Sequence, residues 1–118
     1  AEKNNGAFFN NERIRVSKKN ELSDCLFAIG GRKYNSLNEI STRKSGCAAL
    51  DLAYVASGRY DGYCQSDLNL WDIAAGLIII KEAGGVINDI DLNNHKRLNV
   101  IASSPNINDK FIKKISKF

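Results

Sequence analysis

Asp72 is the residue of this chain whose type and position are best suited to chemistry. It follows Trp71 and opens the run 73–76, which has the periodicity of a helix. A carboxylate at a helix start is favoured by unsatisfied backbone N–H groups and by the helix dipole, so a simple N-cap explains it. The same carboxylate could hold a hard cation such as Mg²⁺ beside a phosphate, although magnesium usually takes more than one protein ligand. The spacing alone leaves both interpretations open.

The other reactive residues do not form a recognisable catalytic set. His95 is the only histidine and lies in a polar turn, so neither a Ser-His-Asp nor a Cys-His nucleophile is supported. Cys25, Cys47 and Cys64 cannot all pair within one chain and lack metal-site spacing. We expect reduced, mostly buried thiols, as in a cytosolic protein. Cys47 precedes a helix that would stabilise a thiolate, but no base accompanies it.

Alternating helices and strands must position these residues. The apolar patterns predict these elements in chain order: a hairpin at 7–16, a strand at 25–29, a helix at 48–56, a strand at 60–64, a helix at 72–83, strands at 86–87 and 100–102, and a helix after 105. The polar segment 32–45 predicts no more than one helical turn, around 37–40. This order indicates an α/β or α+β fold built in layers.

Composition narrows the class of protein. The chain has 118 residues, of which 43% are hydrophobic and 25% charged, as expected for one globular domain. Its longest apolar run, 73–80, is too short to span a bilayer, and residues 1–10 lack a signal core. The net charge of +4 is spread over short basic runs, which indicates solvated faces rather than a nucleic-acid stripe.

Two stretches carry a family resemblance. Residues 46–63, GCAALDLAYVASGRYDGY, and residues 70–85, LWDIAAGLIIIKEAGG, resemble the C-terminal signature of the inositol monophosphatase family. Within that family, these stretches most resemble the bacterial branch that includes the extragenic suppressor protein. GAFFN at 6–10 with IRVS at 14–17 resembles the mid-chain hairpin of that family, and VIAS at 100–103 resembles its last strand. The resemblance therefore covers nearly the whole chain.

The resemblance implies a fold and an activity. The fold would be the layered α/β sandwich of the inositol monophosphatase type, here its C-terminal part with a sheet flanked by helices. Residues 1–20 would be a hairpin belonging to the sheet of the preceding domain, and residues 21–118 the C-terminal α/β domain. The activity would be that of a cytoplasmic, homodimeric, Mg²⁺-dependent phosphomonoesterase acting on inositol monophosphate or a similar small phosphorylated polyol.

It also implies roles for individual residues. Asp72 would be a metal ligand. Gly46, Cys47 and Ala48 would present backbone groups to the hydroxyls of the substrate ring, although ordinary tight packing of helix on sheet also explains them. Arg43 would supply positive potential near the site, with a surface salt bridge as the alternative.

One departure from the family pattern affects the substrate wall. The family usually has a glutamate seven positions before the aspartate of its WD pair, and this chain has Gln65 there. The amide can still form hydrogen bonds, but it lacks the charge that makes acceptance from a hydroxyl strong. Asp67 could substitute, although a solvated loop carboxylate is the simpler interpretation.

Further departures concern missing parts. Between Gly31 and Gly46 the sequence is shorter than the family pattern by about the size of a helix. The upstream motifs that supply a glutamate and two further aspartates are absent. One aspartate cannot assemble a two-metal site, so we expect the 118-residue chain alone to be inactive. The alternative function is a non-catalytic remnant or interaction module associated with RNA or the transcription machinery.

Overall fold

The computed structural model describes residues 1, 3–30, 40–90, 93 and 97–115. Its helices and strands follow in this order: β1 (Phe8–Phe9), β2 (Glu12–Arg13), a 3-10 helix (Leu22–Asp24), β3 (Leu26–Gly30), β4 (Ser41–Arg43), α1 (Ala48–Ala56), β5 (Gly62–Leu68), α2 (Leu70–Glu82), β6 (Val86–Ile87), β7 (Leu98–Ser103) and α3 (Pro105–Ile115). Within these ranges no helix combines the length and apolarity needed to cross a membrane.

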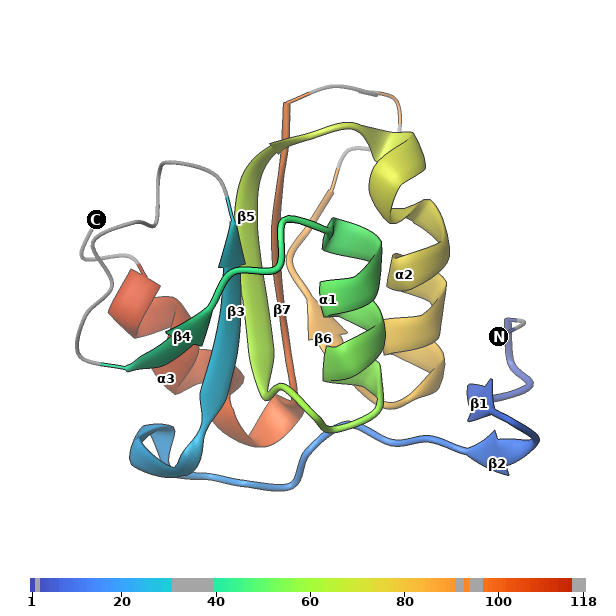
Figure 1. Ribbon diagram of the computed structural model, residues 1–118, viewed down its shortest axis with the longest axis horizontal. Coiled ribbons are helices and arrows are strands. Elements are labelled where there is room, and N and C mark those ends of the chain that lie inside the picture. The colour runs from blue at the N-terminus through green and yellow to red at the C-terminus, as the bar shows by residue number, and fades with distance from the viewer. Residues whose placement is uncertain (2, 31–39, 91–92, 94–96, 116–118) are drawn as a thin grey trace.

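Five strands form one mixed sheet, in the spatial order β4-β3-β5-β7-β6. β3 pairs in parallel with both β4 and β5, whereas β7 runs antiparallel to β5 and β6. The three parallel strands therefore end at the same edge of the sheet. From that edge the chain enters α1 after β4 and α2 after β5, so both helices begin there (Figure 1).

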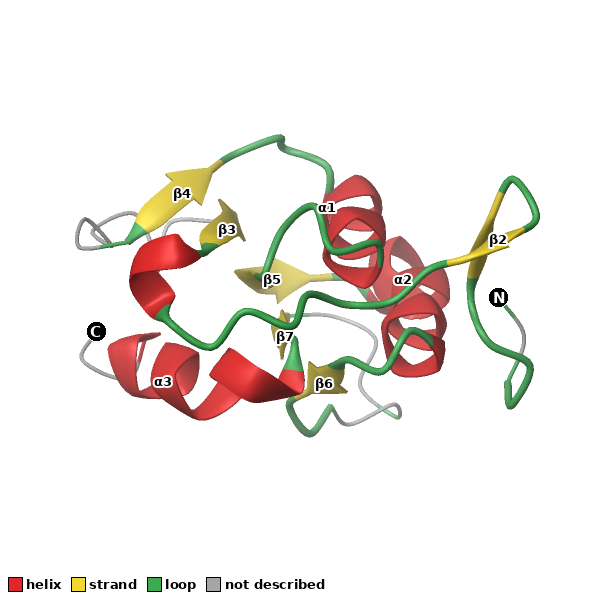
Figure 2. Cartoon of the chain, turned by 90° about the horizontal axis from the view of Figure 1, so that it is seen from below, coloured by secondary structure: helices red, strands yellow, loops and turns green. Residues whose placement is uncertain are grey.

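Helices cover both faces of the sheet, which confirms the expected layered α/β fold. α1 and α2 lie side by side on one face, and α3 lies on the other (Figure 2). The side chains of β3 divide between two cores: Ala28 packs in the α1–α2 core, whereas Phe27 and Ile29 pack in the α3 core. Phe27 stacks on Phe111 of α3 with ring centroids 4.3 Å apart. Burial on both faces explains the uninterrupted apolar run at 25–29.

The expected N-terminal hairpin forms a separate two-stranded sheet, β1 with β2. Asn10 and Asn11 both adopt positive φ, 52° and 67°, as two-residue hairpin turns require. The chain that follows is tied to the end of α2, because the N–H of Val16 donates to the carbonyl of Ala83 at 3.1 Å. The hairpin itself lies beside α2, away from the main sheet (Figure 1).

The polar segment before α1 corrects one expectation. Residues 41–43 form strand β4, although their sequence, Ser-Thr-Arg, predicts no strand. Within the described part of the chain β4 is an edge strand, paired with β3 alone, and it is mostly exposed, so it carries no apolar alternation that would reveal it. The helical turn expected around 37–40 lies almost wholly outside the described residues, as does most of the shortened segment between Gly31 and Gly46.

The boundaries of the central elements also differ from expectation. β5 continues to Leu68 rather than ending at 64, because β7 pairs along it across a register shift. α1 ends as expected, with Gly58 at φ +81° just beyond its C-cap. α1 and α2 pack closely at Gly76, where a Cβ would lie 2.6 Å from Cδ1 of Leu52.

Gly76→Ala should lower the free energy of unfolding by about 1–3 kcal/mol, the usual range for overpacking a close-packed interior. The added methyl group would collide with Leu52, whose Cβ lies only 2.9 Å from the same position. Urea unfolding followed by far-UV circular dichroism measures the change. In a Leu52→Ala background the same substitution should cost less, because the closest contact, with Cδ1, is removed and only the contact with Cβ remains. An equal or higher unfolding midpoint for Gly76→Ala alone would contradict this packing.

Candidate functional site

A polar pocket lies at the sheet edge where α1 and α2 begin. It has a volume of about 310 Å³ and is lined by Gly46, Cys47, Ala48, Ala49, Gln65, Leu68 and Asp72. These residues come from the turn after β4, the first turn of α1, the end of β5 and the first turn of α2. Ligands of open α/β sheets bind at this kind of position, outside the carboxyl ends of parallel strands.

Two helix N-termini meet at this pocket without side-chain caps. Cys47 is the N-cap of α1 and Asn69 the N-cap of α2, and neither side chain bonds to its helix. The first N–H groups of a helix have no partner within it and carry partial positive charge. The pocket is therefore built to receive oxygen atoms, above all those of an anion.

Asp72 is the only charged side chain lining the pocket among the described residues. It is the third residue of α2 and is exposed, and its N–H donates to the carbonyl of Asn69 at 3.1 Å. The N-cap position of α2 is Asn69, so Asp72 is not the N-cap residue but lies in the first turn of the helix. The carboxylate stays available at the pocket wall.

A chain of hydrogen bonds that ends at a buried carboxylate fixes the turn that lines the other side of the pocket. The N–H of Cys47 donates to Oγ of Ser45 at 3.0 Å, and the Ser45 hydroxyl donates to Oδ1 of Asp51 at 2.7 Å. Gly46 between them adopts φ +77°, which few other residues tolerate. Asp51 is 1% exposed, and this burial raises the pKa of its carboxyl, with the Ser45 hydrogen bond acting in the opposite direction.

Gln65 occupies the floor of the pocket, and its side-chain oxygen is already engaged. The hydroxyl of buried Tyr63, two residues earlier on the same face of β5, donates to Oε1 of Gln65. Gly30 on the paired strand leaves room for this arrangement, because a Cβ there would lie 2.3 Å from the same oxygen. The glutamine is therefore held in place by both of its neighbours.

The structure brings together most of the residues singled out from sequence. Gly46, Cys47, Ala48, Gln65 and Asp72 all line the one pocket.

Two other candidates lie apart from it. Arg43 is exposed at the end of β4, where its guanidinium donates to the carbonyl of Thr42 at 2.9 Å. Asp67 is exposed in β5 and does not line the pocket. His95 lies outside the described residues. Cys25 and Cys64 are buried, which raises the pKa of their thiols to about 11 and about 12, as expected of unreactive groups.

Sequence reasoning missed Ser45, Asp51 and Tyr63. The signal for Asp51 was weak, because a carboxylate in the first turn of a helix usually faces solvent. Ser45 could be predicted to matter only if its hydrogen bond to Asp51 across the turn was already known. Tyr63 was visible as a strand residue, but nothing in the sequence shows that its hydroxyl meets Gln65.

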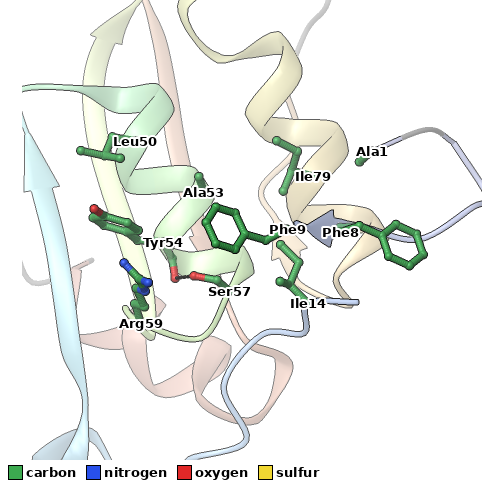
Figure 3. A pocket seen from close by; sticks show the side chains of 11 residues that line it. Ala1, Phe8, Phe9, Ile14, Leu50, Ala53, Tyr54, Ser57, Arg59 and Ile79 are labelled. Carbon is green, nitrogen blue, oxygen red and sulfur yellow. Dashed lines mark hydrogen bonds between the residues drawn. The ribbon is translucent and has the colours of Figure 1, made fainter. Parts of the chain in front are cut away.

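A second, larger cavity of about 400 Å³ lies between the hairpin and the outer side of α1 and α2 (Figure 3). Its walls are mostly apolar and include Phe9, Ile14 and Ala53. Phe9 points toward α1, whereas Phe8 points the opposite way (Figure 3). Its lining has no acidic residue, and its polar side chains are only those of Tyr54, Ser57 and Arg59, so the cavity suits packing rather than chemistry.

Comparison with known proteins identifies the family. The model of the inositol monophosphatase family matches residues 1–118. The chain belongs to this family. A Thermotoga maritima relative named fructose-1,6-bisphosphatase/inositol-1-monophosphatase is 42% identical, over 99% of this chain and 50% of the relative. Nus factor SuhB of Escherichia coli is 34% identical, over 91% and 46% respectively.

The solved structures agree with this assignment. The crystal structure of the extragenic suppressor protein suhB from Bartonella henselae superposes with a TM-score of 0.87 at 36% identity, covering 99% of this chain and 51% of that one. The chain thus belongs with the SuhB branch and spans about half the length of the curated relatives it matches. The Thermotoga maritima alignment runs over 127 residues against the 118 of this chain, so the relative also has residues without a counterpart here.

The burial of Asp51 predicts a pH-dependent stability. The folded state raises its pKa above 3.8, so the native chain binds this proton more tightly than the unfolded chain does. Stability contributed by this group is lost as pH rises through the folded pKa and regained as pH falls toward 3.8. Relative to Asp51→Asn, wild type should therefore gain stability between pH 7 and pH 4 in urea unfolding. The exposed Asp109→Asn should show no such slope, and a flat difference for Asp51→Asn would contradict the burial of a charge.

Proposed function

We propose that this chain forms the substrate-side part of a magnesium-dependent phosphomonoesterase acting on inositol monophosphate or a similar small phosphorylated polyol. The observation that supports it is the convergence of two uncapped helix N-termini on one pocket beside the carboxylate of Asp72. Helix N-termini favour phosphate oxygens, and a carboxylate facing them favours a cation between the two. Membership of the inositol monophosphatase family is consistent with this chemistry.

The donor set of the pocket fits part of a metal site. Asp72 would supply one carboxylate ligand, and Mg²⁺ commonly binds through one or two carboxylates while keeping several waters. Within the described ranges no three His, Cys, Asp or Glu side chains gather around a common point. The remaining ligands would come from the half of the relatives' length that this chain does not span. When bound, the metal supplies Lewis acidity toward a phosphate oxygen.

The chain's own residues would bind and orient the rest of the substrate. The backbone N–H groups at the start of α1 would donate hydrogen bonds to oxygens of the substrate ring. The Ser45–Asp51 hydrogen bond would keep the preceding turn in position. Leu68 gives the pocket one apolar wall. Arg43 would add positive potential from a distance, since its side chain does not line the pocket.

The hairpin supports a further proposal about domain organisation. Residues 1–20 would belong to a sheet of the preceding half, and residues 21–118 would form the C-terminal α/β domain. An isolated two-stranded hairpin is at best marginally stable, and Phe8 and Phe9 are 53% and 63% exposed on opposite faces of this one. Both faces therefore need cover that the described residues do not supply.

Assembly and location follow as lesser proposals. Trp71 is 66% exposed and Ile78 45% exposed on α2, an apolar surface suited to protein contact in a homodimer. Three unpaired cysteines, with Cys47 exposed, suit the reducing cytoplasm.

A chimera tests the proposed function directly. The half of the Thermotoga maritima relative that this chain does not match would be fused ahead of residue 1, and phosphate release from inositol 1-phosphate measured with Mg²⁺. We expect activity that Asp72→Asn lowers roughly a hundredfold or more, because a lost metal ligand removes several kcal/mol of transition-state stabilisation. Asp67→Asn, a matched change at an exposed site outside the pocket, should leave activity unchanged.

The unfused chain is the negative control for this experiment. It should release no phosphate above its own Asp72→Asn variant and should bind Mg²⁺ negligibly by calorimetry. Activity of the unfused chain, or equal activity of the folded chimera with and without Asp72, would refute the proposed role.

The second candidate function is an interaction module for RNA or the transcription machinery. The name of the Escherichia coli relative, Nus factor, gives one reason to consider it. A second reason is the charge of α3. The apolar side of this helix is buried, and Lys110, Lys113 and Lys114 lie along its outer side. A basic helix of this kind can contact phosphates.

Salt dependence of RNA binding distinguishes this function. For single-stranded RNA measured by fluorescence anisotropy, K113E/K114E should weaken binding and reduce the slope of log K against log salt by about 1.4, for two lost phosphate contacts. The control K3E/R15E makes the same charge change on the hairpin side and should keep the wild-type slope. Equal slopes for all three proteins would exclude α3 as an RNA surface.

A further inference from the structure

The amide of Gln65 determines which kind of oxygen the pocket can bind. A glutamine side chain has one acceptor oxygen and one NH₂ donor, whereas a glutamate carboxylate only accepts. In this chain Oε1 accepts the hydroxyl of Tyr63, and that oxygen is also the atom nearest to Gly30. The group of Gln65 that remains for the pocket is its NH₂.

The environment of Tyr63 fixes this orientation. Tyr63 is fully buried, and burial raises the pKa of its hydroxyl, so it keeps its proton and needs an acceptor for it. Among the described residues Oε1 of Gln65 is the one hydrogen-bond partner of that hydroxyl. Turning the amide over would place NH₂ against the hydroxyl and leave the tyrosine proton without an acceptor inside the core. The NH₂ group donates to none of the described residues, which leaves it available to a ligand.

We infer that Gln65 is a specificity-determining residue that offers hydrogen-bond donors to the pocket and so selects phosphorylated sugars bearing an acceptor-only anionic group, a carboxylate or a second phosphate, beside it. The inference rests on the proposed function, because it concerns the ligand of the same pocket. A hydroxyl can accept from the amide but gains no charge assistance. A carboxylate or phosphate oxygen accepts a stronger, charge-assisted hydrogen bond from the same NH₂. Two uncapped helix N-termini nearby favour the same anionic oxygens.

Glutamate at this position would reverse the preference. Its second oxygen would face the pocket as a charged acceptor, so it would bind a hydroxyl donor and repel an anionic oxygen. The space for this exchange exists, because glutamate and glutamine have the same shape and Tyr63 can donate to either. Gln65→Glu is therefore a substitution that changes the hydrogen-bonding character of the pocket and little else.

The first test uses the ligand-free chain. By ¹H–¹⁵N NMR, the Gln65 side-chain NH₂ protons should exchange quickly with water, whereas the Tyr63 hydroxyl proton, observed in a ¹H spectrum, should be protected. Tyr63→Phe should shift the Gln65 side-chain resonances, because its oxygen loses the donor. Slow exchange of the Gln65 NH₂ protons in the ligand-free chain would show that the nitrogen faces the core and would overturn the inference.

The second test compares three ligands that differ only at carbon 6: glucose 1-phosphate, glucuronic acid 1-phosphate and glucose 1,6-bisphosphate. Chemical-shift changes of the backbone amides of residues 46–48 report that a ligand has entered the pocket. Changes of the Gln65 NH₂ resonances report that the ligand contacts Gln65. Wild type should bind the carboxylate and the bisphosphate about tenfold more tightly than glucose 1-phosphate. Gln65→Glu should reverse that order. Asn11→Asp, the same amide-to-carboxylate change on the exposed hairpin turn, should keep it.

The outcomes separate this inference from the proposed function. If the carboxylate alone gains affinity, or the bisphosphate alone, that result names which anionic group the pocket takes, and the inference stands. If amides 46–48 shift but all three ligands bind equally in wild type and Gln65→Glu, the phosphate pocket stands and the inference fails. If no ligand shifts amides 46–48, the inference fails, while phosphate release by the chimera decides the proposed function separately.

Discussion

The parallel pairing of β3 with β4 and β5 is the constraint on which the rest of the structure depends. Parallel neighbours cannot be joined by a tight turn, so the chain must leave the sheet and return over one face. α1 carries the chain from β4 to β5, the two strands that flank β3, and α2 begins just after β5 ends. The pocket, both uncapped helix N-termini and the carboxylate of Asp72 are all consequences of that pairing. The register that sets Gly30 opposite Gln65 belongs to the same pairing.

The pocket is held by buried polar groups, which do not add much to stability. Asp51 is a carboxylate in the core, and its raised pKa shows that the folded environment disfavours the charged form. What its hydrogen bond to Ser45 provides is a fixed turn at Gly46, a residue in the left-handed region. Tyr63 acts similarly on Gln65, since its buried hydroxyl restrains an otherwise flexible side chain. Both contacts thus contribute little to the free energy of unfolding but hold the pocket wall in one conformation.

The sequence predicted the parts of the fold whose residues repeat with the period of their element. The strand at 25–29, the Asn10-Asn11 turn and the three helices were all readable in this way. Strand β4 was not, because an exposed edge strand of three polar residues has no apolar pattern. The pocket residues were largely foreseen through the family resemblance, but their orientation was not. Whether the oxygen or the NH₂ group of Gln65 is engaged depends on Tyr63, whose position is set by packing, and no spacing rule encodes it.

Two aspartates near the ends of β5 lie in contrasting environments. Asp61, just before β5, is fully buried and accepts the N–H of Leu26 at 2.8 Å, while Lys19 lies 3.6 Å away. It thereby joins the start of β5 to the start of β3 and to the segment leaving the hairpin. Asp72, just after β5, is exposed and contacts neither Leu26 nor Lys19. A buried, paired carboxylate stabilises the ends of strands, whereas an exposed one at the carboxyl edge is available to a ligand. Their environments, rather than their proximity to a motif, therefore separate the two roles.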